Sequence, residues 1–327
     1  MVKVKFAMLS FKIKVYGVSL LVESELEEAG NELLEEYRDH LTGEPTAISG
    51  TIRILREEPV LDHVPDRAVR ISTVFPSSSV YSHGGRVYFH DEGNFSISVD
   101  PSSLSIDVWA SPKAKLFEKL RYLSKHLLIT ALERKGTMWI HGSASSYGSG
   151  ALLFTGVSGS GKTTCLLAMI ARGHRMVTDD VILLENGKAL PFYMRSMVHS
   201  RTLERFPDLK PHLSSASVWD EKADGSWLNL GKAFGVEQRP LPPKALFNTH
   251  VWNSDGSECR SSPPVKAVPK LMRNYLLESG SVFEPPQDQA KRAFAAYSSL
   301  AEAIPCFDLY VGRDTRGLID AIEGALR

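Results

Sequence analysis

The fold of this 327-residue chain is decided by the stretch ALLFTGVSGSGKTT at residues 151–164. Its first part, Ala151 to Thr155, is an apolar run that predicts a buried strand. The part from Gly156 to Thr163 fits the pattern G-x-x-x-x-G-K-[ST] without a mismatch. Residues 163–172 then show apolar side chains at helical spacing, and Gly173 ends them. Strand, glycine-rich loop and helix in this order predict an α/β fold built around a phosphate-binding loop.

The loop predicts a cradle for the phosphates of a nucleotide. Its glycines let consecutive backbone N–H groups turn inward, and the following helix points its positive end at the same anion. Lys162 is expected to reach the β- and γ-phosphates, and the Thr163 hydroxyl to bind Mg²⁺. ATP and Mg²⁺ are therefore the expected cofactors, although ADP or pyrophosphate remains open as a donor because the loop reads phosphates. The residues assigned to the nucleotide are Gly156, Ser158, Gly159, Ser160, Gly161, Lys162, Thr163 and Thr164.

A pair of acids, Asp179 and Asp180, ends the stretch 175–180, in which the next strand is predicted. One helix and one strand fit between Lys162 and Asp179. A right-handed crossover would then lay this strand parallel to the loop strand, with both carboxyl ends at one edge. The pair would emerge beside the bound phosphates, where one acid can hold Mg²⁺ and the other can take a proton from an attacking hydroxyl.

Composition limits the partners of the chain. Hydrophobic residues make up 43% and charged residues 23%, and the 38 basic side chains balance the 38 acidic ones. A balanced charge disfavours a large nucleic-acid footprint, and no apolar run is long enough to cross a membrane. We expect no signal peptide, a cytoplasmic location, and neither nucleic acid nor membrane as a partner. Three scattered cysteines predict neither a disulfide framework nor a zinc site.

The chain divides, by prediction, into a small β-rich domain at 1–110 and the phosphate-loop domain at 111–327. In the first domain, strands are expected within 3–22, at 51–55 and between 71 and 108, where turn sequences separate short runs into an antiparallel arrangement. The expected helices of this half of the chain lie at 23–40 and 113–135. A strand at 137–141 and a Gly/Ser-rich turn should precede the loop strand, and 253–264 reads as a mobile loop.

The string from His141-Gly142 through the phosphate loop to Asp179-Asp180 resembles the catalytic core of the HPr kinase/phosphorylases. It is similar, more distantly, to ATP-dependent phosphoenolpyruvate carboxykinase, and it looks most like diverged HPr-kinase-like proteins that phosphorylate small peptides. The resemblance implies a P-loop domain of HPr kinase/carboxykinase type. It also implies that Lys162 binds phosphate, that Thr163 is a metal ligand and that Asp180 binds the metal or a phosphate. Asp179 would be the general base, and His141 would lie near the active site.

The resemblance implies an ATP-dependent kinase that transfers the γ-phosphoryl group to a hydroxyl acceptor. The Arg-Gly-Leu-Gly signature of the true HPr kinase/phosphorylases does not follow the acid pair, so the acceptor stays open between a peptide or protein serine and a small alcohol. A homo-oligomer also stays open. Three rival functions remain: a nucleotide-binding regulator, a simple ATPase with water as acceptor, and a carboxykinase-like enzyme acting on an organic acid.

Overall fold

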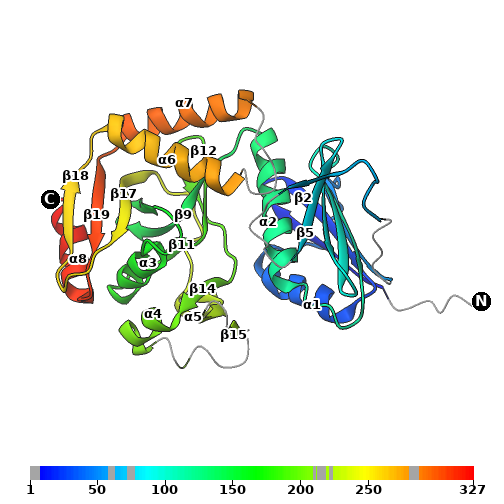
Figure 1. The fold of residues 1–327 in the computed structure, drawn as a ribbon. Helices are drawn as coiled ribbons and strands as arrows, with labels where there is room; N and C mark the ends of the chain where they lie inside the picture. The colour runs from blue at the N-terminus through cyan, green and yellow to red at the C-terminus, as the bar shows by residue number, and fades with distance from the viewer. Residues whose placement is uncertain are drawn as a thin grey trace, which may run out of the picture. The chain divides into compact units, whose positions relative to one another are not determined.

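The computed structural model describes residues 8–57, 63–71, 78–208, 211, 219–220, 224–279 and 287–327. The chain forms two compact units (Figure 1), one of Met1–Gly136 with Ser279–Glu284, the other of Thr137–Glu278 with Pro285–Arg327. The helix α2, Phe117–Arg134, thus belongs to the first unit, whereas the boundary predicted at residue 110 placed it with the phosphate loop. Its leucine-rich side packs on β2 and β8 of the first unit, which explains the difference.

The first unit combines one large sheet with the helices α1 and α2. Its described elements besides α2 are β1 Leu9–Val15, β2 Val18–Ser24, α1 Glu27–Glu36, the 3-10 turn Arg38–His40, β3 Gly50–Arg56, β4 Val69–Ile71, β5 Ser79–His83, β6 Arg86–Asp91, β7 Phe95–Asp100 and β8 Ser105–Ala110. The strands predicted at 3–22, 51–55 and 71–108 are therefore present, except that residues 3–7 and 72–77 lie outside the described part of the chain.

The antiparallel arrangement predicted for the strands between 71 and 108 is confirmed, because β4 to β8 pair antiparallel in chain order. The sheet that contains these strands is mixed as a whole. Its strand order is β1-β2-β3-β8-β7-β6-β5-β4, and the pairs β2–β3 and β3–β8 are parallel. β2 and β3 are parallel because the helix α1 connects them, and a crossover of this kind leaves the two strands running in the same direction. Side chains such as Ile52, Ile54 and Val108 form the buried face.

Asp100, the last residue of β7, anchors the turn that leads into β8. One carboxylate oxygen accepts hydrogen bonds from the backbone N–H of Ser102 at 2.9 Å and of Ser103 at 3.3 Å. The other oxygen pairs with Arg86 at 2.8 Å. Burial alone would raise the pKa of Asp100, but hydrogen bonds from Ser102 and Ser103 outweigh burial and lower the pKa to about 2.

Asp100→Asn is expected to make the free energy of unfolding depend less on pH below about pH 5. Because the folded pKa lies below that of an unfolded Asp, the carboxylate stabilises the fold above about pH 4, and this contribution is lost as the pH falls towards about 2. Between about pH 5 and pH 2.5, wild type should lose about 1–2 kcal/mol of unfolding free energy more than the variant, measured by urea titration. Asp39→Asn, an exposed control, should follow wild type. Equal losses of unfolding free energy in Asp100→Asn and wild type would contradict a lowered pKa of Asp100 in the folded protein.

The second unit holds the phosphate-loop sequence. Its described strands are β9 Met138–Tyr147, β10 Gly150–Thr155, β11 Met176–Thr178, β12 Val181–Glu185, β13 Lys188–Leu190, β14 Ser196–His199, β15 Trp219–Asp220, β16 Gly225–Leu228, β17 Pro243–Val251, β18 Glu258–Ser261 and β19 Cys306–Val311. Its described helices are α3 Lys162–Ala171, α4 Ser200–Arg205, α5 Leu230–Phe234, α6 Pro264–Ser279, α7 Gln287–Ala303 and α8 Thr315–Gly324.

The main sheet of this unit has the order β13-β12-β9-β10-β17-β19-β18, with β11 paired to β9. The pairs β10–β17 and β17–β19 are parallel, so three carboxyl ends meet at one edge. The crossover prediction needs a correction, because β11 does not lie next to the loop strand. The strand β9 lies between them and runs antiparallel to both, so β11 and β10 still point the same way. The predicted common edge is therefore retained.

Two stretches of the second unit differ from the sequence prediction. The strand predicted at 137–141 continues to Tyr147, because the serines that read as a turn are buried in the sheet, including Ser143 and Ser145. The stretch 253–264, predicted as a mobile loop, contains the strand β18. Backbone bonds from Arg313 to Ser254 and from Asp314 to Asp255 hold the loop before that strand in place.

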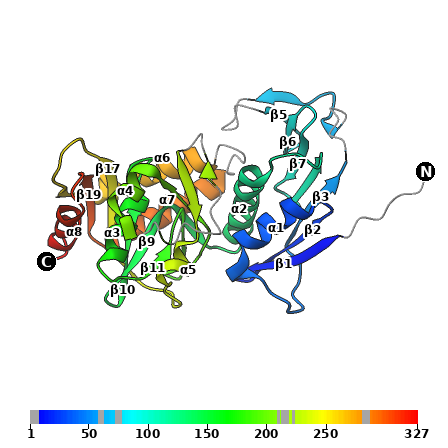
Figure 2. The same ribbon diagram turned by 90° about the horizontal axis from the view of Figure 1, so that it is seen from below.

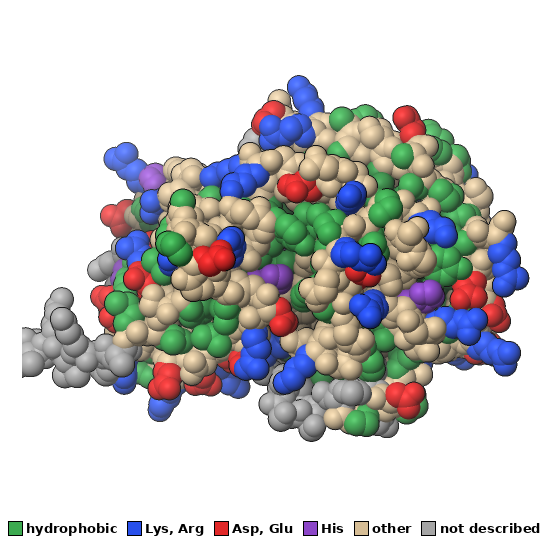
Figure 3. Space-filling view, turned by 180° about the vertical axis from the view of Figure 1, so that it is seen from behind, with side chains coloured by type: hydrophobic (Ala, Val, Ile, Leu, Met, Phe, Trp, Pro, Cys, Tyr) green, Lys and Arg blue, Asp and Glu red, His purple; other side chains and the backbone are tan. Residues whose placement is uncertain are grey.

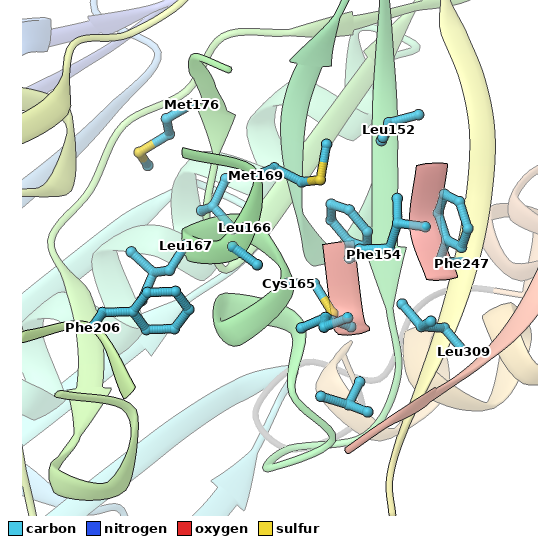
Figure 4. Packing of buried hydrophobic residues seen from close by; sticks show 14 of the residues in the cluster. Leu152, Phe154, Cys165, Leu166, Leu167, Met169, Met176, Phe206, Phe247 and Leu309 are labelled. Carbon is cyan, nitrogen blue, oxygen red and sulfur yellow. The ribbon is translucent and has the colours of Figure 1, made fainter. Parts of the chain in front are cut away.

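A hydrophobic core fixes the loop helix α3 against the sheet (Figure 4). Leu166 and Met169 of α3 pack with Phe154 of β10, Phe247 of β17 and Leu309 of β19 in one buried cluster. Figures 1 and 2 show α3 and α8 on one side of this sheet and α6 and α7 on the other. Burial of this cluster stabilises the helix end that faces the carboxyl edge of the sheet.

Gly142 of β9 lies where three strands approach one another. A Cβ atom there would stand 2.4 Å from the carbonyl oxygen of Phe154 and 2.9 Å from Cδ1 of Ile182. Because a backbone carbonyl cannot move aside cheaply, Gly142→Ala is expected to lower the free energy of unfolding by roughly 2–4 kcal/mol in urea. Gly256→Ala has open space and should change it by less than about 0.5 kcal/mol. Equal stabilities of the two variants would refute the clash.

On the face seen in Figure 3, positively charged Lys and Arg side chains are interspersed with negatively charged Asp and Glu side chains. This distribution agrees with the balanced composition and offers no field of a single sign on that face. In the described part of the chain, none of the helices combines the length and the apolar character needed to cross a bilayer.

Candidate functional site

The phosphate loop connects β10 directly to α3, as the sequence predicted. Gly156, Gly159 and Gly161 take φ values of 152°, 75° and 101°, a region that side chains with a Cβ rarely adopt. A Cβ on Gly156 would also stand 2.5 Å from Oγ of Ser160 and 2.9 Å from the carbonyl oxygen of Thr249. The glycines are therefore required by the backbone path, which leaves loop N–H groups able to face an anion.

The remaining loop residues assigned to the nucleotide differ in exposure. Ser158 and Gly159 are exposed at the tip of the loop, and Thr164 lies half-buried in the first turn of α3. Ser160 is buried, and its hydroxyl lies 2.8 Å from that of Thr249 on β17. The Thr249 hydroxyl also donates to the carbonyl oxygen of Thr155 at 3.1 Å. Thr249 thus ties the loop to the neighbouring strand.

Lys162 folds its side chain back over the loop. Its ammonium group donates to the carbonyl oxygens of Gly156 at 3.0 Å and Val157 at 2.9 Å, and the residue is 8% exposed. Burial lowers the pKa of Lys162, while the negative charges of Asp180 and Asp179 oppose that change. A buried cation held at the phosphate loop near two acids is well placed to meet a polyphosphate.

Asp179 lies directly beside the first turn of α3. The Thr163 hydroxyl is 3.2 Å from one of its carboxylate oxygens and 3.3 Å from the other, and Asp179 is 5% exposed. Burial raises the pKa of Asp179; the nearby Ser196 hydroxyl opposes this, Asp180 adds to it, and Thr163 opposes it. The predicted neighbourhood of Lys162, Thr163 and Asp179 is therefore present in the fold.

Asp180 occupies a strained backbone position next to this group. Its φ is 74°, in the left-handed region that Asp tolerates better than most residues, and its carbonyl oxygen accepts the N–H of Gly142 at 3.1 Å. The carboxylate lies 3.5 Å from Nδ1 of His141. His141 is thus brought to the acid pair, as the resemblance implied. Strain of this kind concentrates at functional sites.

Three residues of this region were missed by the sequence reasoning: Thr249, Asn274 and Glu278. The Asn274 amide lies 3.4 Å from the Thr155 hydroxyl, and the Glu278 carboxylate lies 3.7 Å from Nε2 of His141. For Thr249, the apolar run 245–247 that ends in polar residues was a usable sign of a second strand at the carboxyl edge. Nothing in the sequence distinguishes Asn274 and Glu278 from other polar residues of their helix.

The donor set fits Mg²⁺ supplied with a nucleotide better than a metal held by protein alone. Over the described ranges, no three His, Cys, Asp or Glu side chains come together to hold a metal ion. Mg²⁺ commonly takes one or two protein oxygens and completes its shell with phosphate oxygens and water. The Thr163 hydroxyl and the neighbouring carboxylates of Asp179 and Asp180 can supply those oxygens.

Comparison with known proteins points to one family. No protein-family model matches the chain. HPr kinase/phosphorylases of Xanthomonas campestris pv. campestris (strain B100) and Stenotrophomonas maltophilia (strain K279a) are each 41% identical to it over 73 residues, 22% of this chain and 22% of theirs. The match thus spans about a fifth of the length of these curated relatives.

A solved structure of the Hpr(Ser) kinase/phosphatase from Coxiella burnetii is similar at 14% identity and a TM-score of 0.28, over 57% of this chain and 95% of that one. The predicted resemblance to the HPr kinase/phosphorylases is confirmed over this segment of 73 residues.

Proposed function

We propose that the protein is a kinase that transfers the γ-phosphoryl group of ATP to a hydroxyl acceptor, with Mg²⁺. The observation that carries the proposal is the contact of the Asp179 carboxylate with the Thr163 hydroxyl, beside the buried ammonium of Lys162. Buried carboxylates with a perturbed pKa cluster at catalytic sites, which favours a reaction over nucleotide binding alone. The relatives that share the 73-residue match are HPr kinase/phosphorylases, which supports the same class of reaction.

In this proposal each residue has one task. The loop from Gly156 to Gly161 and the amino end of α3 bind the phosphates, and Lys162 turns from its loop carbonyls to the transferring group. Asp179 accepts the proton of the attacking hydroxyl. Asp180 and Thr163 would hold Mg²⁺, which supplies positive charge to the phosphate oxygens. We propose that a P-loop domain of HPr kinase/carboxykinase type carries out this reaction. The acceptor would be a serine of a peptide or protein, or a small alcohol.

The test is turnover of γ-labelled ATP with Mg²⁺, first alone and then with a pool of peptides and metabolites. Label that moves to an acceptor supports the proposal and identifies the acceptor class. Steady release of labelled phosphate without an acceptor would favour the ATPase, in which water takes the place of the hydroxyl. Tight ATP binding with neither transfer nor hydrolysis would leave the nucleotide-gated regulator.

Asp180→Asn should separate the roles of the two acids. Because an amide is a poorer Mg²⁺ ligand than a carboxylate, this variant is expected to need about tenfold more Mg²⁺ for half-maximal transfer, while saturating Mg²⁺ restores part of the rate. The measurement is initial rate against Mg²⁺ concentration at fixed ATP. If Asp179→Asn shifts the Mg²⁺ requirement and Asp180→Asn does not, the roles of base and metal ligand must be exchanged.

A further inference from the structure

The helix α6 places three polar side chains in one row over the carboxyl edge of the main sheet. Lys270, Asn274 and Glu278 follow at intervals of four residues, which puts them on one side of a helix. Lys270 pairs with Asp308 of β19, and the Asn274 amide approaches Thr155 at the end of β10. Glu278, the next in the row, approaches His141 of β9. The row therefore crosses the sheet at the edge where the phosphate loop begins.

The His141 ring lies between two carboxylates. Its Nδ1 is 3.5 Å from the Asp180 carboxylate and its Nε2 is 3.7 Å from the Glu278 carboxylate, so each ring nitrogen faces one acid at slightly more than hydrogen-bond length. The His141 side chain is 11% exposed and that of Glu278 26%. Glu278 also attracts the ammonium of Lys162 electrostatically. The carboxylate thus acts on two members of the proposed site.

The position of Glu278 is not explained by the stability of its own helix. It is the residue before the last of α6, and a negative charge at the carboxyl end of a helix is repelled by the helix dipole. A cost of this kind is offset when the charge serves a contact elsewhere, here with His141 and Lys162.

We propose that Glu278 is a positioning residue of the phosphoryl-transfer site. It holds the His141 ring against Asp180 and thereby fixes the orientation of the Asp180 carboxylate beside the phosphate loop. The inference rests on the proposed function, because Asp180 matters to the reaction only if the site uses its metal.

A double-mutant cycle on Glu278→Gln and His141→Ala tests the inference, read by kcat and KM for ATP and separately by Mn²⁺ binding in the presence of ADP. Residues that orient a metal ligand commonly change affinity or activity by about 10–100-fold. We expect Glu278→Gln to lower kcat by about that factor with KM for ATP within about threefold, and to weaken Mn²⁺ binding about tenfold. The double variant should lose no more kcat and no more Mn²⁺ affinity than His141→Ala alone, because Glu278 acts through His141. Glu302→Gln, an exposed carboxylate on α7, is the matched control and should behave as wild type.

Two results overturn the inference. One is a Glu278→Gln variant with the kcat and the Mn²⁺ affinity of wild type. The other is a double variant whose losses are the product of the single losses, which would show that Glu278 does not act through His141. A wild-type protein that transfers no phosphoryl group contradicts the proposed function and not the inference, because the Mn²⁺ cycle still reports whether Glu278 and His141 are coupled.

Discussion

Lys162→Met is expected to abolish phosphoryl transfer while leaving the fold intact. In the proposed reaction the ammonium of Lys162 is the protein's own positive charge at the transferring group, and loss of one such preorganised donor costs about 10²–10³-fold in rate. Because Lys162 also binds the ground-state phosphates, we expect kcat/KM for ATP to fall by at least about 10³-fold. The measurement is turnover of γ-labelled ATP together with nucleotide binding by calorimetry.

The fold should tolerate this change because two opposing effects nearly cancel. Burial lowers the pKa of Lys162, so its charge is held in the folded state at a cost that methionine removes. Methionine also loses the two hydrogen bonds to Gly156 and Val157. We expect a melting temperature within about 3 °C of wild type. Lys188→Met, at an exposed lysine of β13, is the control and should keep both stability and turnover. An active Lys162→Met would remove the loop from the mechanism.

The phosphate loop could be predicted from local sequence because its chemistry is local. The glycines at 156, 159 and 161 are needed for their own φ values, and the lysine that follows them lies on the first turn of the helix that they begin. No distant contact has to be known for that reasoning. The strand and helix on either side carry apolar residues that all enter one core, so their pattern is unambiguous.

The path of β9 could not be predicted because its pattern is not that of an apolar strand. Residues 142–146 are small or hydroxylic and resemble a turn, yet Ser143 and Ser145 are fully buried. The Ser143 hydroxyl donates to the carbonyl oxygen of Lys162 at 2.9 Å, which supplies a partner that only the tertiary fold provides. Because these residues resemble a turn, the sequence does not predict that β9 continues and lies between β10 and β11.

The predicted position of the acid pair beside the loop does not depend on the path of β9. The carboxyl ends of β10 and β11 share an edge whether or not the strands are neighbours, because β9 runs antiparallel to both. Glu278 is a different case. Its helix begins about a hundred residues after the loop helix starts, and its contact with His141 depends on how α6 crosses the sheet. Helical spacing can indicate the row 270, 274 and 278 but not the surface beneath it.

Asp179→Asn is expected to lose transfer while keeping nucleotide binding and stability. Asparagine has nearly the shape of aspartate and keeps an oxygen for the Thr163 hydroxyl, whose contacts with Asp179 are 3.2 and 3.3 Å. It cannot take up the proton of an attacking hydroxyl, and removal of a general base commonly costs 10²–10⁴-fold. We therefore expect kcat to fall by about 10³-fold with a change of less than about threefold in the Kd for ATP.

The stability of the same variant reports on the charge of Asp179. Burial raises the pKa of this carboxyl, so the negative charge is disfavoured inside the fold and its removal should leave the free energy of unfolding unchanged or higher. Asp320→Asn, at an exposed acid of α8, is the matched control for both turnover and unfolding. An Asp179→Asn protein that folds, binds ATP and transfers phosphoryl at the wild-type rate would show that the acceptor hydroxyl needs no base at this position. A protein that folds but has lost ATP binding would instead place Asp179 in the nucleotide and metal cradle, and the hydrogen bond from Thr163 would then be the contact through which it acts.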